Sequence, residues 1–259
     1  MLSNMECLIA ILKLAVRMAA CLGLGPVLGL GVALACVTAP VRADDLSDFN
    51  AAVEAAMNHH RVASGYLRTG NIDLAALELE GMREAWSRVA SLPKPAVFAD
   101  RDGYTATMLD VSTRLVGIFL VLDMGRPDVA LDSLNTTRHA LAALRRAAKV
   151  EVLADCVLDA NTAMDALFVL RASLPDWSAP GNAANVARLA ADYRAALQRC
   201  DRMAPPGIRN HAEFRRLVYG ALASLGQFPK AIETRDGDLL QRLLIELRSF
   251  DHLLAFRYG

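Results

Sequence analysis

The chain reads Leu131-Asp-Ser-Leu-Asn-Thr-Thr-Arg-His-Ala-Leu-Ala142, and its Leu, His and final Ala recur 113 residues later in Leu244-Ile-Glu-Leu-Arg-Ser-Phe-Asp-His-Leu-Leu-Ala255. A second pair lies upstream, where residues 82–88 match residues 193–199 at an offset of 111. Two segments that recur in the same order, at nearly the same offset, indicate a duplicated unit. The sequence therefore predicts two copies of one helical unit.

Almost every segment after residue 45 has the apolar spacing of a helix, three or four residues apart, and is rich in Ala, Leu, Arg and Glu. Gly and Pro residues mark the ends of these segments. We predict an all-α fold, with two up-down four-helix-bundle-like units at 44–149 and 150–259. The expected helices are 46–68, 72–92, 104–124, one from 127 onward, 183–203, 210–225 and 238–257.

The boundary between the two units stays open. Residues 129–173 contain neither Gly nor Pro, so a single helix of roughly 70 Å could run through them at about 1.5 Å per residue. The alternative is a break near Lys149-Val150.

The N-terminal 43 residues resemble a secretory signal peptide. Lys13 and Arg17 precede an uncharged run from Met18 to Val41, and Val41-Arg-Ala43 has small residues where a signal peptidase cleaves. We therefore expect a periplasmic or secreted protein. The run is also long enough to span a bilayer, so the alternative is a membrane anchor that leaves the rest facing the periplasm.

Charge gives no support for a nucleic-acid partner, because the 28 Lys and Arg residues equal the 28 Asp and Glu residues. Any membrane contact is expected only through an uncleaved N-terminal segment.

Two of the five cysteines, Cys156 and Cys200, lie beyond the signal peptide. Each is 22 residues from residue 178, the centre of the loop expected at 174–183. Residues equidistant from the turn of an antiparallel hairpin lie at the same height, so these cysteines are disulfide candidates in an oxidising compartment. The alternative is two buried free thiols.

Three histidines are candidate cofactor ligands. His60 and His139 are expected near mid-height of antiparallel helices, and His139 and His252 hold equivalent places in the two copies. Imidazoles that meet in a bundle core can bind haem iron or a divalent metal. The alternative is a structural or surface role for each. No di-iron, covalent-haem, nucleotide-binding or hydrolase motif occurs, so no catalytic residue and no metal site are assigned and an enzyme is not predicted.

Short segments resemble the small periplasmic b-type cytochromes, four-helix bundles related to the cytochromes c-prime. They are Leu134-Asn-Thr-Thr-Arg138, Met82-Arg-Glu-Ala85, Glu213-Phe-Arg215 and the ending Phe256-Arg257. The resemblance implies a haem-type four-helix bundle, here doubled. The family holds haem between a Met and a His, and this chain has Asn50 and Ala142 at those positions.

Three turns also resemble those of tetratricopeptide repeats, with a Gly followed five residues later by an Ala. They begin at Gly70, Gly125 and Gly226. Their spacing of 55 and 101 residues is not a multiple of the 34 residues typical of that family.

The sequence thus predicts an exported, non-enzymatic helical protein that binds a partner protein or a small ligand. The alternatives are a haem or metal carrier of the periplasm and a tetratricopeptide-like interaction scaffold.

Overall fold

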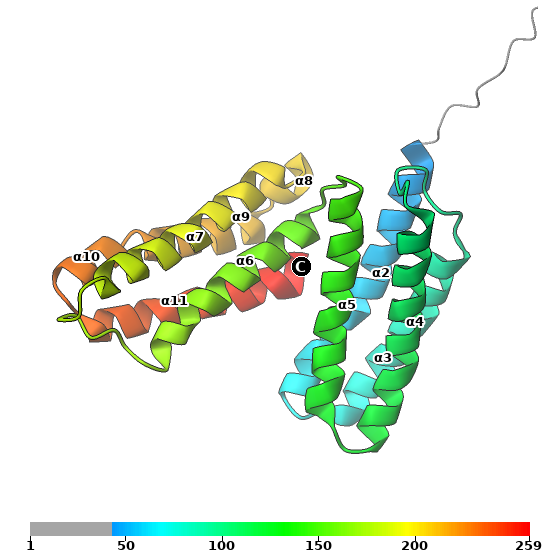
Figure 1. Ribbon diagram of the computed structural model, residues 1–259, viewed down its shortest axis with the longest axis horizontal. Helices are drawn as coiled ribbons and strands as arrows, with labels where there is room; N and C mark the ends of the chain where they lie inside the picture. Colours follow the sequence, from blue (N-terminus) through cyan, green and yellow to red (C-terminus); the bar gives the residue numbers. More distant parts are fainter. Residues whose placement is uncertain (1–42) are drawn as a thin grey trace, which may run out of the picture. The chain divides into compact units, whose positions relative to one another are not determined.

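The computed structural model describes residues 43–259, which belong to one compact unit from Val41 to Gly259 (Figure 1). The predicted signal peptide lies outside the described residues. Every regular element from residue 43 onward is a helix, and no strand occurs in this part of the chain. The prediction of an all-α fold is therefore confirmed.

Four long helices make up the first half of the described chain: α2 (Ala43–Arg68), α3 (Ile72–Ser91), α4 (Arg101–Asp123) and α5 (Pro127–Ala147). Helix α2 contacts α3 and α5, and α4 contacts the same two helices, so the four surround one hydrophobic core. Burial of one face of each helix is the main source of their stability. The largest fully buried side chains of this first core are Phe49, Phe98, Leu79, Met82, Leu115, Ile118, Leu134 and Leu141.

The turns of this first group follow the predicted glycines. Gly70, between α2 and α3, has φ +76°, and Gly125, between α4 and α5, has φ +69°. These are left-handed conformations that glycine adopts without steric cost. Pro127 begins α5, where the missing N–H of a proline leaves no helical hydrogen bond unmade.

Helix α5 ends before α6 (Leu153–Phe168) begins, so residues 129–173 do not form one continuous helix. Lys149 has φ +56°, so it leaves the helical conformation although no Gly or Pro is present. A buried ion pair spans the break: Arg145 Nε and Nη2 donate to the Asp155 carboxylate at 2.8 and 2.5 Å. Two parallel bonds of this kind fix orientation as well as distance.

Six helices and one short 3₁₀ turn follow the break. After α6 come the 3₁₀ turn η1 (Val169–Arg171), α7 (Asn182–Met203), α8 (Pro206–Arg209), α9 (Ala212–Leu225), α10 (Phe228–Glu233) and α11 (Gly237–Tyr258). Helices α6, α7, α9 and α11 contact one another around a second core. Its largest buried side chains are Tyr193, Phe214, Phe228 and Met164.

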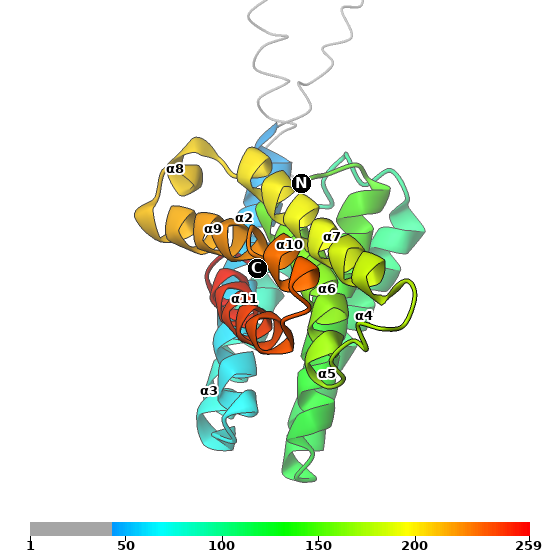
Figure 2. The same cartoon turned by 90° about the vertical axis from the view of Figure 1, so that its left-hand side faces the viewer.

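Two short helices, α8 and α10, lie in the gaps between the expected helices 183–203, 210–225 and 238–257. Figure 2 shows α8 between the end of α7 and the start of α9, and α10 beside α7. Each has a proline in its first turn, Pro206 in α8 and Pro229 in α10. Proline is tolerated in the first turn of a helix, where its missing N–H leaves no hydrogen bond unmade. A proline that ends one helix can therefore also lie at the start of the next.

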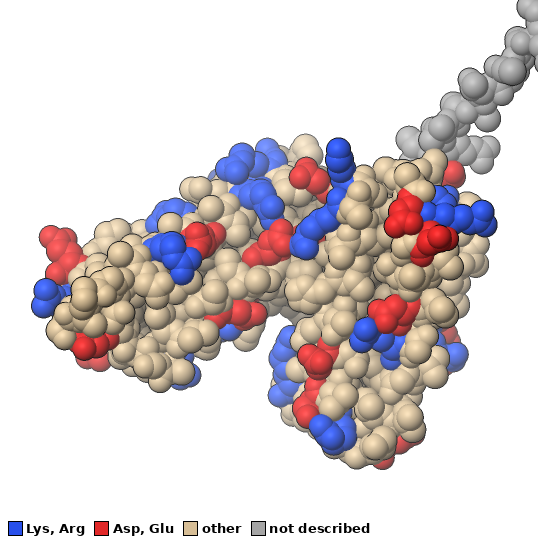
Figure 3. Space-filling model, in the orientation of Figure 1, with Lys and Arg blue, Asp and Glu red and all other residues tan. Residues whose placement is uncertain are grey.

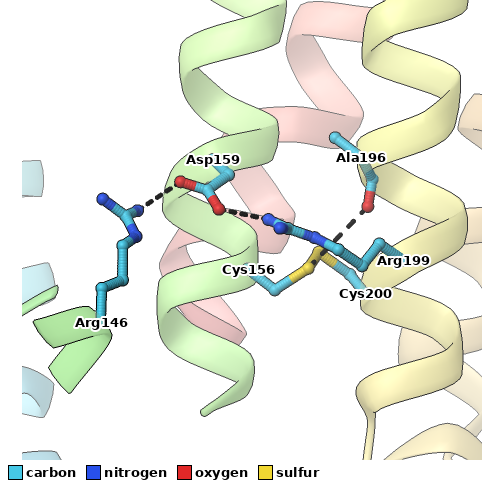
Figure 4. Close-up of a disulfide and its surroundings, with 6 residues drawn as sticks. All are labelled: Arg146, Cys156, Asp159, Ala196, Arg199 and Cys200. Carbon is cyan, nitrogen blue, oxygen red and sulfur yellow. Dashed lines mark hydrogen bonds and ion pairs between the residues drawn. A yellow bond between two sulfur atoms is a disulfide. The ribbon is translucent and has the colours of Figure 1, made fainter. Parts of the chain in front are cut away.

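Cys156 in α6 and Cys200 in α7 form a disulfide, with Cα atoms 5.5 Å apart (Figure 4). Both residues are buried in the second core. Beside the disulfide, the Asp159 carboxylate pairs with both Arg146 of α5 and Arg199 of α7. The cysteines that the hairpin geometry singled out are thus covalently joined, and one carboxylate connects three helices next to them.

Helix α4 is apolar on its outer face as well as its inner face. Leu109, Val116 and Leu120 are 67%, 68% and 63% exposed, whereas Val111 and Leu115 are buried in the first core. By length and composition alone α4 would suffice to cross a membrane. Its inner face packs on α3 and α5, as a core helix of a bundle does.

The matched segments of the sequence occupy corresponding helices. Residues 82–88 lie in α3 and 193–199 in α7, the second long helix of each group; 131–142 lie in α5 and 244–255 in α11, the last of each. The pairs Met82 and Tyr193 and Leu134 and Leu247 are buried in both groups. The duplication itself stays a prediction.

Candidate functional site

A polar cavity of about 240 Å³ lies where α2, α5, α6 and α11 meet. Figure 1 shows the end of α11 beside α5 at this place. A cavity of this size lies just below the range typical of pockets for drug-sized ligands, about 300–1,000 Å³. The titratable residues that line it are His60, Arg61, Arg68, Arg138, His139, Asp165, Arg248, Asp251 and His252.

All three histidines proposed from the sequence line this cavity. His60 of α2 is buried, while His139 of α5 and His252 of α11 are exposed. Burial lowers the pKa of His60 to about 3, and burial and Arg248 lower the pKa of His252. His60 is therefore neutral at physiological pH.

The hydrogen bond of His60 fixes which nitrogen carries its proton. His60 Nε2 lies 2.9 Å from the backbone oxygen of Leu134. A carbonyl oxygen can only accept, so Nε2 donates and Nδ1 keeps a free lone pair. Nδ1 is buried and has no hydrogen-bond partner among the described residues, and the same holds for Oγ of Ser64, one turn further along α2. Both residues line the cavity.

Two of the four arginines at the cavity already have acidic or carbonyl partners. Arg61 donates to the Gly259 oxygen at 2.5 Å and to Glu54 at 2.7 Å. Arg248 donates to Asp165 at 2.6 Å, and its guanidinium lies 4.4 Å from the centre of the Phe168 ring.

The other two arginines lack an acidic partner among residues 43–259. Arg138 donates only to the neutral amide oxygen of Asn161, at 3.3 Å, and Arg68 makes no hydrogen bond or ion pair in this part of the chain. Burial, followed by Arg61 and Arg68, lowers the pKa of Arg138 to about 10. Burial and Arg248 likewise lower the pKa of Arg68. The cavity lining thus holds four guanidinium groups and two side-chain carboxylates, those of Asp165 and Asp251.

A buried carboxylate, Asp251, forms part of the cavity wall and is 1% exposed. It accepts hydrogen bonds from Asn161 Nδ2 at 2.9 Å and from the Tyr193 hydroxyl at 3.5 Å. Burial raises its pKa to about 6. Asn161 accepts from Arg138 and donates to Asp251, so one amide connects α5, α6 and α11.

The three histidines do not assemble a metal site. No cluster of three or more His, Cys, Asp or Glu side chains suited to a metal ion occurs in the described residues. Nε2 of His60 is engaged by Leu134, and the cavity wall is mainly charged and polar. The arrangement instead suits a small anion.

A second hollow, of about 460 Å³, is apolar. It lies between α7, α9 and α10 and is lined by residues such as Ala190, Leu225, Phe228 and Ile232. None of the buried unpaired side-chain atoms of the described chain belongs to its lining. The polar cavity is therefore the stronger candidate for a specific ligand.

The sequence reasoning singled out the histidines but missed the arginines and Asp251. A signal was present in the paired segments: Arg138-His139 corresponds to Asp251-His252 at the offset of 113. Oppositely charged residues at equivalent inward positions of two similar helices indicate a polar interior. Arg68 had no comparable signal, because it is the last residue of α2 and resembles any basic residue at a helix end.

Figure 3 shows acidic and basic side chains interspersed on the visible face, with no broad area of one sign. This agrees with the zero net charge of the chain. The concentration of unbalanced positive charge is a local property of the cavity. Function therefore has to be inferred from the cavity, because no family model, curated protein or solved structure matches the chain.

Proposed function

We propose that this protein is an exported binding protein for a small anionic ligand, which is held in the cavity between α2, α5, α6 and α11. The observation that carries the proposal is that Arg68 and Arg138 line this cavity without an acidic partner among the described residues. Arg138 is partly buried without a carboxylate partner, and an anion that bonds to it and to the exposed Arg68 would compensate their charges.

The walls of the cavity support an anion over a cation or a neutral apolar molecule. Arg248 is shared between Asp165 and Asp251, so Arg68 and Arg138 contribute the positive charge that an anion would meet. Two guanidinium groups without a carboxylate partner suit a ligand with two negative charges. Planar guanidinium groups bind carboxylates and phosphates through paired hydrogen bonds.

The Cys156–Cys200 disulfide supports the exported location. Disulfides persist in oxidising compartments and are rare in the cytosol of most organisms. A haem carrier, a metal carrier and a tetratricopeptide-like scaffold are less well supported, because the cavity wall is polar and the helices enclose separate cores.

The proposal is tested by the thermal stability of the full chain in the presence of succinate or phosphate. A ligand that binds only the folded protein stabilises it by about 2.7 kcal/mol at one hundred times its dissociation constant. We expect the melting temperature to rise in either anion, above the effect of sodium chloride at equal ionic strength.

Arg68→Gln should reduce the rise, and Arg88→Gln should leave it unchanged. Both arginines are exposed, and Arg88 lies in α3, outside the cavity lining. The two variants remove the same charge from different places. A rise that sodium chloride reproduces, or that both variants reduce equally, would contradict a specific anion site.

A further inference from the structure

The unpaired ring nitrogen Nδ1 of His60 indicates which functional group the ligand carries in addition to its negative charge. Nε2 donates to the Leu134 oxygen, so Nδ1 is an acceptor without a hydrogen. It is buried in a residue that is 2% exposed, and no described residue donates to it. A ligand group that satisfies Nδ1 must therefore bring a hydrogen.

Ser64 carries a second buried atom without a hydrogen-bond partner among the described residues. It lies one helical turn after His60 in α2, so the two side chains share a face of that helix. Its Oγ is buried, its side chain is 2% exposed, and it too has no partner among residues 43–259. A serine hydroxyl can donate as well as accept. A hydroxyl group that reaches both atoms would donate to His60 Nδ1 and accept from Ser64 Oγ.

The surrounding charges decide between a hydroxyl and an ammonium group as the donor. Arg138, Arg61 and Arg68 all act on His60 to disfavour positive charge there. An ammonium placed between His60 and Ser64 would face the same repulsion. A neutral hydroxyl satisfies both atoms and adds no charge.

We propose that the ligand is a small dianion with a free hydroxyl group, either a hydroxydicarboxylate or the phosphate ester of a small polyol. This inference rests on the proposed function. The acidic groups bond to Arg68 and Arg138, and the hydroxyl lies between His60 and Ser64. A ligand without the hydroxyl leaves both buried atoms unpaired, which is the kind of loss on which polar discrimination depends.

Calorimetric titration of the full chain with two matched pairs tests the inference. Malate differs from succinate by one hydroxyl group, and glycerol 3-phosphate differs from propyl phosphate by two. We expect the hydroxylated member of at least one pair to bind about tenfold or more tightly, as one or two buried hydrogen bonds imply. The pair that discriminates identifies the acid class.

Ser64→Ala should reduce that ratio to about twofold or less and leave the affinity of the non-hydroxylated member unchanged. His60→Gln, which keeps an amide donor in reach of the Leu134 oxygen, should also reduce the ratio. Ser87→Ala, an exposed position on α3 outside the cavity lining, should change neither affinity. Circular dichroism establishes that each variant is folded; if His60→Gln is not, Ser64→Ala alone decides.

The outcomes separate the two proposals. If none of the four compounds binds, the anion site itself is wrong. If the members of each pair bind equally, the anion site stands and the hydroxyl inference is overturned. If the ratio persists in folded Ser64→Ala protein, the hydroxyl is bound elsewhere and the assignment to these residues is wrong.

Discussion

Removal of the disulfide should strongly destabilise the second helical group. The change is Cys200→Ala, which opens the loop of 44 residues that separates the two cysteines. In the chain-entropy model, a cross-link across about 44 residues stabilises the folded state by about 4 kcal/mol. With a urea slope of about 2 kcal/mol per molar, the midpoint should fall by about 2 M.

Fluorescence of Trp177 provides the assay, because this side chain packs against the second core. Trp86 is buried in the first core and would add a separate signal, so the measurement is made in a Trp86→Phe background. Cys156→Ala should cost about as much as Cys200→Ala, and the double variant little more, since either change breaks the same bond.

Asp159→Asn is the comparison that isolates the covalent bond. Asp159 contacts Arg146 and Arg199 next to the disulfide, and its side chain is 35% exposed. Loss of each of these two partly exposed ion pairs costs about 1 kcal/mol or less. The reasoning fails if reducing the wild-type protein leaves the urea midpoint unchanged, or if non-reduced digests lack peptides that join Cys156 to Cys200.

Three further changes have definite expected outcomes. Stability that depends on neutral His60 is lost as pH falls from 6.5 towards its folded pKa of about 3, whereas ionised Asp251 costs stability as pH rises from about 4 through its folded pKa of about 6. The two effects oppose each other between about pH 4 and 6, so urea titrations of Asp251→Asn should reveal a steeper loss towards acid pH than wild type, by about 1.4 kcal/mol per pH unit; equal slopes would contradict this. Asp155→Ala should cost about 3–5 kcal/mol, because it leaves Arg145 buried without its partner, and Arg145→Met combined with Asp155→Leu should recover most of that in thermal melts. Gly65→Ala, in the interior of α2 with nothing within 4 Å of the added Cβ, should raise the unfolding free energy by about 0.5–1 kcal/mol; a loss would show that the site is more crowded than the structure indicates.

Local chemistry was enough to predict most of the long helices, but not the short helices α8 and α10. The turns at Gly70 and Gly125 require left-handed backbone, and Pro127 marks a helix start, so the ends of α2 and α4 and the start of α5 follow from single residues. The break at Lys149 could not be predicted in the same way. It depends on the Arg145–Asp155 pair and on burial around it, which are tertiary effects that no local residue type announces.

The cavity was predictable only in part. His60, His139 and His252 were chosen by helical height and by the match between segments, and the structure brings all three to one cavity. The arginines that define its charge come from the last turn of α2 and the middle of α5 and α11. Their convergence depends on how four helices pack, and helical periodicity in one segment does not contain that information.

The cavity draws on helices of both cores, which has a mechanical consequence. Helices α2 and α5 enclose the first core, and α6 and α11 enclose the second. A ligand bound in this cavity would contact helices of both cores, so separating the two groups of helices would break its contacts and expose the ligand to water. By mass action, a ligand that binds only when the two groups of helices are together raises the free energy needed to separate them. When a ligand is bound, hydrogen exchange should slow first at backbone amides in the helical turns that line the cavity. Amides in the interior of either core should change later.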